Sequence, residues 1–184
     1  LMGLVPIKSG SIEFDGQPVH KKTPYERARA GMGFVPQGRE IFARLTVEEN
    51  LRMGLAYRSA SMPIAPELYE LFPVLKEMKQ RRGGDLSGGQ QQQLAIGRAL
   101  VLDPKLLILD EPTEGIQPNV VAEIGDIIRR LNREIGLTVL LVEQKLPFAR
   151  KVGDTFCLLD RGRNVATGAM SELDESLIRT YLTV

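Results

Sequence analysis

Two short apolar runs in the second half of the chain, LLIL at 106–109 and LTVLLVE at 137–143, constrain the fold most. The segment between them repeats apolar residues at helical spacing, with its charged residues on the other side. The residues on its apolar face are Val120, Ile124, Ile127, Ile128, Leu131 and Ile135. Continuous apolar runs of this length are typical of strands buried on both faces. Strand, helix and strand at this spacing predict a right-handed parallel βαβ unit, and therefore an α/β fold.

The first hundred residues add another strand and a helical insertion to this core. The run MGFV at 32–35 is expected to form a buried strand, and residues 46–82 read as mostly helical, with a break at Pro73. Gly83 and Gly84 are placed to end that helical stretch. Two Thr-x-x-Glu capping boxes mark helix starts, Thr23 with Glu26 and Thr46 with Glu49.

Composition excludes several classes of protein. The 184 residues carry 24 Lys and Arg against 23 Asp and Glu, which gives no reason to expect a nucleic-acid-binding surface. A single cysteine excludes an intrachain disulfide and fits a reducing, cytosolic setting. No apolar stretch approaches the length of a membrane span. Work at a membrane would therefore need a partner that holds the protein there.

Two adjacent carboxylates, Asp110 and Glu111, follow the apolar run at 106–109. In open α/β sheets, ligands gather beyond the carboxyl ends of the strands. An acid at such a strand end can hold Mg²⁺ bound to a nucleotide phosphate, and the next acid can orient or deprotonate an attacking water. The alternative is an Asp-Glu-Pro turn that only caps the following segment, and these residues alone favour neither interpretation.

Two further polar motifs stand at element boundaries. Gln37 directly follows the strand expected at 32–35, and its amide carbonyl can ligate a hard cation, although a loop Gln is usually only solvated. In LSGGQ, Ser87 is a favoured helix N-cap, and Gly88 and Gly89 allow a ligand to approach the backbone N–H groups of the helix start. The competing interpretation is a plain N-cap beside a flexible glycine linker.

The order of these motifs resembles that of the ATP-binding subunits of ABC transporters over essentially the whole chain. The matching segments are Gln37 at the Q-loop, Leu86–Gln90 at the signature, Leu106–Glu111 at the Walker B strand and Thr113–Pro118 at the D-loop. The resemblance implies a RecA-like α/β P-loop NTPase core at 1–38 and 101–184, a helical subdomain at 39–100, and Mg-ATP hydrolysis that drives transport.

The resemblance also implies a role for each matched residue. Glu111 is expected to be the general base or to position water, and Asp110 and Gln37 to serve Mg²⁺. Ser87, Gly88, Gly89 and Gln90 are expected to close over ATP held by a second ATPase subunit.

Two departures from the family pattern stand out. The chain contains no GxxxxGK[ST] motif and no Gly-Lys dipeptide, so it resembles a family member that lacks its first strands and P-loop, about 30 or more residues. The family's switch histidine is replaced by Gln144, which can hydrogen-bond a γ-phosphate but cannot carry a proton at neutral pH. We therefore expect Gln144 to sense the γ-phosphate and not to shuttle protons.

The motifs VEQ, VPQGREIF and DEPTEGIQP resemble the branch that serves branched-chain amino acid and urea uptake, and TEGIQP is closer to the urea type. This resemblance implies an importer with membrane-embedded permease subunits, a second ATPase subunit and, indirectly, a solute-binding protein, at the cytoplasmic face of the bacterial inner membrane. Two alternatives stay open: a non-transport ABC ATPase, disfavoured because no long coiled coil interrupts the motifs, and a folded fragment that hydrolyses nothing.

Overall fold

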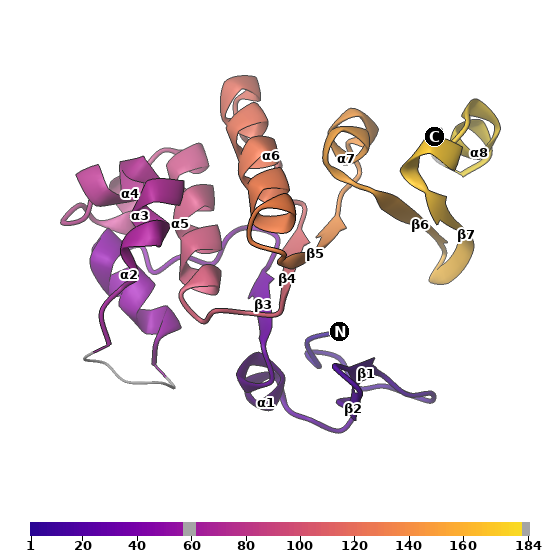
Figure 1. The fold of residues 1–184 in the computed structure, drawn as a ribbon, viewed down its shortest axis with the longest axis horizontal. Coiled ribbons are helices and arrows are strands. Elements are labelled where there is room, and N and C mark those ends of the chain that lie inside the picture. Colours follow the sequence, from indigo (N-terminus) through magenta and orange to yellow (C-terminus); the bar gives the residue numbers. More distant parts are fainter. Residues whose placement is uncertain (57–61, 182–184) are drawn as a thin grey trace. The chain divides into compact units, whose positions relative to one another are not determined.

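The computed structural model describes residues 1–56 and 62–181, which fall into two compact units (Figure 1). The first unit is Leu1–Val142, and the second is Glu143–Val184, described as far as residue 181. Within the described residues, no helix is both long and apolar enough to cross a membrane.

A three-stranded parallel sheet forms the centre of the first unit. Its strands, in spatial order, are β3 (Met32–Val35), β4 (Leu106–Asp110) and β5 (Thr138–Val142). Both pairs are parallel, with Phe34 opposite Ile108 and Ile108 opposite Leu140. Helix α6 (Pro118–Arg133) connects β4 to β5, so the predicted βαβ unit and the α/β fold class are confirmed.

The two apolar runs that predicted this unit differ in burial. Leu107 and Leu109 of β4 are 0 % exposed, as expected for a strand buried on both faces. Strand β5 alternates instead, with Leu140 38 % and Val142 47 % exposed, so the prediction that β5 is also buried on both faces is wrong. Strand β4 has a hydrogen-bonded neighbour on each side, whereas β5 is an edge strand; β3, the other edge strand, is buried because α1 and α5 pack against it.

Helix α6 buries the centre of its predicted apolar face, with Ile124, Ile128 and Leu131 all enclosed. Ile135 lies beyond the helix end at Arg133 and is 64 % exposed, so its assignment to that face is wrong. The turn between helix and β5 requires Gly136, whose φ of +78° is strained for residues that carry a Cβ. Its N–H donates to the Asn132 carbonyl just beyond the helix end at Arg133.

In its described residues, 39–56 and 62–100, the helical insertion has four helices and a 3₁₀ turn that pack together (Figure 1). They are α2 (Val47–Gly54), α3 (Pro66–Leu71), α4 (Pro73–Glu77), η1 (Gly83–Asp85) and α5 (Gly88–Leu100). The break at Pro73 is confirmed, because α3 ends at Leu71 and α4 begins at Pro73. Gly83 and Gly84 do not end a long helix as predicted. The helix stops at Glu77, and the two glycines start the 3₁₀ turn.

Glycines allow close packing inside this insertion. A Cβ on Gly54 would lie 2.4 Å from the Arg98 carbonyl oxygen, which shows how closely the end of α2 approaches α5. Large apolar side chains fill the space between these helices, and the fully buried ones are Leu51, Leu55, Phe72, Leu75, Leu94 and Ile96. Burial of these apolar side chains is the main contribution to the stability of the insertion.

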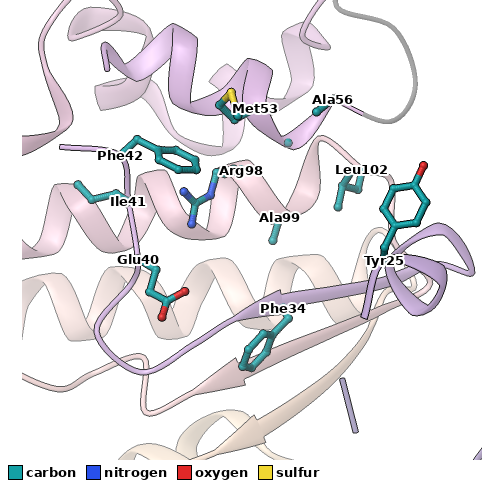
Figure 2. Close-up of a pocket in the computed structure, with 11 residues that line it drawn as sticks. Tyr25, Phe34, Glu40, Ile41, Phe42, Met53, Ala56, Arg98, Ala99 and Leu102 are labelled. Atoms are coloured by element: carbon teal, nitrogen blue, oxygen red, sulfur yellow. The ribbon is translucent and has the colours of Figure 1, made fainter. Parts of the chain in front are cut away.

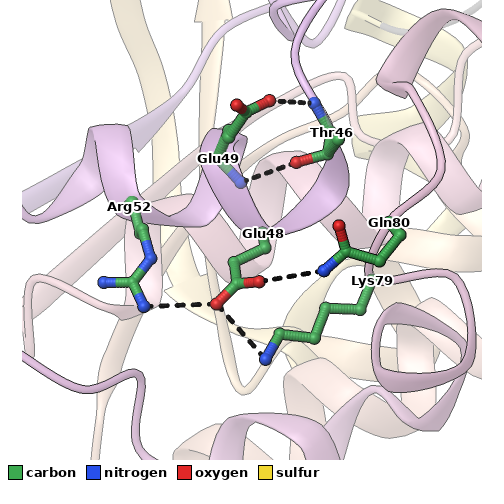
Figure 3. Close-up of polar contacts among 6 residues, drawn as sticks. All are labelled: Thr46, Glu48, Glu49, Arg52, Lys79 and Gln80. Carbon is green, nitrogen blue, oxygen red and sulfur yellow. Dashed lines mark hydrogen bonds and ion pairs between the residues drawn. The ribbon is translucent and has the colours of Figure 1, made fainter.

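Polar contacts fix the start of α2 against the segment that follows α4 (Figure 3). The predicted Thr46–Glu49 capping box is present, and next to it Glu48 accepts hydrogen bonds from Arg52, Lys79 and Gln80, each at 3.2 Å. Partial desolvation raises the pKa of Glu48, but the bonds from Lys79 and Arg52 outweigh it and hold the pKa below its usual value.

The N-terminal part of the first unit is a hairpin followed by a short helix. Strands β1 (Glu13–Phe14) and β2 (Gln17–Pro18) pair across a turn at Asp15 and Gly16, and α1 (Pro24–Arg29) begins at the predicted Thr23 capping box. The guanidinium of Arg27 is buried and donates to the carbonyls of Leu1, His20 and Lys22. Arg27 therefore ties α1 to the segments on both sides of the hairpin.

The second unit contains an antiparallel pair of strands flanked by short helices. Its elements are α7 (Leu146–Val152), β6 (Thr155–Asp160), β7 (Arg163–Ala169), η2 (Met170–Glu172) and α8 (Glu175–Tyr181). The two strands pair across a turn at Arg161 and Gly162. After β7 the chain first makes the 3₁₀ turn, and the last helix begins at Glu175.

Candidate functional site

The LSGGQ segment is a rigid helix start. Ser87 is the N-cap of α5: its Oγ accepts from the Gln90 N–H at 3.4 Å, and the Gln90 side-chain oxygen accepts from the Ser87 N–H at 2.9 Å. This reciprocal capping box fixes the first turn, whose remaining N–H groups have no partner within the helix. The arrangement suits an anion, because the helix dipole and the oriented N–H groups act together.

Gly89 has a packing role as well. It is buried in the helix, and a Cβ there would lie 2.5 Å from Val120 Cγ1, so α6 approaches α5 at this glycine. The interpretation of a flexible glycine linker is therefore wrong. Ser87 is exposed and Gly88 half-buried, which leaves the outer side of the helix start accessible.

Asp110 and Glu111 stand at the carboxyl end of β4, as predicted. Asp110 is paired in register with Val142 of β5, and the Glu111 N–H donates to the Val142 carbonyl at 2.9 Å. Glu111 has a φ of +45°, an uncommon conformation for a residue with a Cβ. Such strain is found where surrounding structure fixes a functional side chain, and here the buried Pro112 and Thr113 follow directly.

The structure brings Gln37 against Glu111. The Gln37 amide nitrogen donates to a carboxylate oxygen of Glu111 at 3.2 Å and to one of Glu114 at 3.1 Å. Gln37 follows β3 and Glu111 follows β4, so two adjacent parallel strands deliver these side chains to one edge of the sheet. The sequence prediction missed Glu114. The one signal in the sequence was its position three residues after Glu111. In the structure these residues form a turn, in which the Glu114 N–H donates to the Glu111 carbonyl.

The side chains at this edge offer the chemistry of a magnesium site. Asp110, Glu111 and Gln37 supply oxygen donors, which hard divalent cations prefer. Gln37 is exposed, so rotation of its amide can present oxygen in place of nitrogen. In the described part of the chain, no three His, Cys, Asp or Glu side chains cluster closely enough to hold a metal ion. Proteins usually bind Mg²⁺ through one or two carboxylates together with substrate phosphates.

Asp110 also lines a groove of about 290 Å³ on one face of the sheet. Sheet residues form one wall of this groove, and residues of the first seven positions together with Arg27 form the other. Gln144 belongs to the second unit, where its N–H donates to the Glu143 carboxylate at 3.1 Å. Its expected role at a γ-phosphate stays a prediction.

A larger groove, of about 660 Å³, lies beside the Gln37 loop (Figure 2). Its lining is mostly apolar, and Tyr25, Phe42 and Met53 are all exposed there. Arg98 of α5 is the cation among them, with its guanidinium carbon 5.1 Å from the centre of the Phe42 ring. Burial lowers the pKa of Arg98, and the carboxylate of Glu40 opposes that effect. An apolar surface with a central cation and a carboxylate is typical of a protein-binding site.

The family model described as ABC transporter matches residues 1–114 of this chain. The high-affinity branched-chain amino acid transport ATP-binding protein BraG of Pseudomonas aeruginosa is 44% identical over an alignment of 186 residues, gaps included. The alignment covers 99% of this chain and 79% of that protein. The probable branched-chain amino acid transport ATP-binding protein LivF of Archaeoglobus fulgidus is 36% identical, over 95% of this chain and 75% of that one.

Solved structures show the same fold. The ADP conformation of MJ1267, an ATP-binding cassette of an ABC transporter, superposes with a TM-score of 0.76 at 25% identity. The superposition covers 99% of this chain and 80% of that one.

Proposed function

This chain belongs to the ABC transporter family, whose ATP-binding subunits are ATP-hydrolysing enzymes, and we propose that it powers a bacterial importer. The observation that carries the proposal is the contact of Gln37 with Glu111, at 3.2 Å. It brings together, from two different strands, an amide that can serve a metal ion and a carboxylate that can position water, which are two of the parts that phosphoryl transfer uses.

The proposed roles follow from this geometry. Glu111 orients or deprotonates the attacking water, because its carboxylate is fixed at the end of a buried strand by the backbone bond to Val142. Asp110 and Gln37 hold Mg²⁺, which when bound neutralises charge on the transferred phosphoryl group. Gln144 senses the γ-phosphate through its amide. The N–H groups and hydroxyl at Ser87–Gln90 receive the phosphate of ATP bound to a second ATPase subunit.

The groove at Phe42 and Arg98 is the proposed contact with the permease. Its apolar lining and central cation suit a short helix that ends in exposed carbonyls, because Arg98 can donate to them. A subunit attached in this way works at the cytoplasmic face of the inner membrane, with a solute-binding protein as an indirect partner.

Two solutes are proposed for the importer. The motif TEGIQP favours urea. The names of BraG and LivF favour a branched-chain amino acid. Transport by the complex in proteoliposomes, measured with each labelled solute in turn, decides between them, since ATP-dependent uptake of only one is expected.

The Glu111→Gln variant of the subunit, in its transporter complex, tests the catalytic role. It is expected to lose ATP hydrolysis by about a hundredfold or more and to keep its affinity for ATP, because the amide cannot act as a base but preserves the shape of the side chain. Glu77→Gln is the matched control, since Glu77 is an exposed carboxylate on α4. Undiminished turnover in Glu111→Gln would contradict the assignment.

A further inference from the structure

Arg39 bonds two segments that are far apart in the sequence and meet near Glu111. Its Nη2 donates to the Glu114 carbonyl at 2.8 Å, and its Nε donates to the side-chain oxygen of Gln92 at 3.3 Å. Gln92 belongs to α5, the helix that starts at Ser87. One guanidinium thus links the loop that carries Gln37 to the loop after Glu111 and to the signature helix.

The backbone around Arg39 is shaped for this reach. Arg39 and Glu40 both have positive φ values, +69° and +46°, and the Glu40 N–H donates to the Gly38 carbonyl at 2.8 Å. Residues with a Cβ rarely adopt this conformation, so the turn is maintained by its contacts. One such contact comes from the groove: Arg98, which lies over Phe42, donates from Nη2 to the Arg39 carbonyl at 3.2 Å.

The helix start leaves room for the guanidinium. A Cβ on Gly88 would lie 3.6 Å from both terminal nitrogens of Arg39, and one on Gly115 would lie 3.8 Å from Nη2. The Arg39 side chain therefore passes between the first turn of α5 and the loop after Glu111. Its position there is next to the helix start that is proposed to receive phosphate and to the loop that follows the proposed catalytic Glu111.

These contacts differ from an ordinary surface ion pair, which contributes little. Both acceptors are neutral carbonyl oxygens, and Gln92 is only 2 % exposed. Removal of Arg39 would leave a buried acceptor without its donor, which costs more than the bond itself contributes. A lysine cannot replace the arginine, since the two bonds use nitrogens at the fixed spacing of a planar fork.

We propose that Arg39 is a positioning residue. It holds Glu111 and the signature helix α5 in fixed positions relative to the groove that contains Phe42 and Arg98. A partner seated in the groove moves Arg98 and the Arg39 backbone, and the Arg39 side chain passes that movement to the Glu114 loop and to α5 together. The catalytic part of this inference rests on the proposed function, whereas the link between the segments does not.

The link is tested by amide hydrogen exchange on Arg39→Gln, Arg39→Lys and the control Arg44→Gln. Arg44 is an exposed arginine in the same segment, so its loss changes the charge equally. Exchange at residues 88–91 and 113–116 is expected to rise together, about tenfold in Arg39→Gln and severalfold in Arg39→Lys, with no rise in the control. A rise in only one segment, or none in either, overturns the link. If Arg39→Gln does not fold, the same criteria apply to Arg39→Lys.

The positioning role is tested by ATPase kinetics of the same variants in the transporter complex. Arg39→Gln is expected to lower kcat about tenfold with KM for ATP within about twofold of the wild type, because positioning is lost while nucleotide affinity is kept. Equal kcat values for Arg39→Gln and Arg44→Gln overturn the role. A wild-type complex that hydrolyses no ATP contradicts the proposed function instead, and the exchange experiment then still decides on the link.

Discussion

Strands β4 and β5 look alike in sequence and differ in the structure. Each has five residues, each is almost entirely apolar, and they pair in parallel with each other. Yet Leu107 of β4 is 0 % exposed and Leu140 of β5 is 38 % exposed. Strand β4 has a neighbour on each side and leads into Asp110 and Glu111, whereas β5 is one of the two edge strands and leads into Gln144. An apolar run therefore predicts a strand, but its burial and the precision of the site at its end depend on its neighbours.

The largest expected difference between the two strands is catalytic. We expect Asp110→Asn to lower ATP hydrolysis by between about a hundredfold and a thousandfold, because it removes a charge that serves the metal ion at the reacting phosphate. Gln144→Ala should lower hydrolysis about tenfold at most, since it removes a single neutral hydrogen bond. Steady-state ATPase rates of the two variants in the transporter complex measure both effects. A larger loss in Gln144→Ala would reverse the ranking of the two strand ends.

The next difference is in stability. Leu107→Ala should reduce the free energy of unfolding by about 3 kcal/mol, because it leaves a cavity between fully buried neighbours. Leu140→Ala makes the same chemical change at a partly exposed site and should cost about 1 kcal/mol or less. Urea denaturation of both variants measures the two losses of unfolding free energy, and we expect the same dependence of that free energy on urea concentration in both. Equal losses would mean that the outer strand is as enclosed in solution as the central one.

The smallest expected difference concerns the turns that lead into the two strands. Gly136, before β5, has a φ of +78°, and a Cβ at this position would meet no atom within 4 Å, so Gly136→Ala should cost about 1 kcal/mol through backbone strain alone. Asp103, before β4, has a φ of +51° despite its Cβ, and Asp103→Gly should change stability by less than about 0.5 kcal/mol, since relief of strain offsets the added chain entropy. Thermal unfolding of the two variants measures both, and a larger cost for Asp103→Gly would show that the Asp103 side chain stabilises its turn.

Local chemistry explains the predictions that succeeded. The capping boxes at Thr23 and Thr46 and the N-cap at Ser87 involve residues at most three apart, so the sequence contains everything that forms them. The parallel βαβ unit was also predictable, because its helix and strands have different apolar periods. The place of Asp110 and Glu111 at the end of β4 followed from that unit.

The misses depend on distant residues. Glu114 and Arg39 gained their partners only when β3, β4 and α5 came together, and no spacing in the sequence relates them to Gln37 or Gln92. Gly89 was interpreted as a phosphate contact or as part of a flexible linker, whereas the residue it packs against, Val120 of α6, lies 31 positions away along the chain.

The sequence by itself determined the strands, the helix starts and the order of the polar motifs, because each of these depends on side chains that are close along the chain. Tertiary structure decided which strand is central, how Gln37 meets Glu111 and Glu114, and where the Arg39 guanidinium lies. The physical reason is that burial and hydrogen-bond geometry are set by groups brought together in space, and a sheet edge collects side chains from strands that are some seventy residues apart.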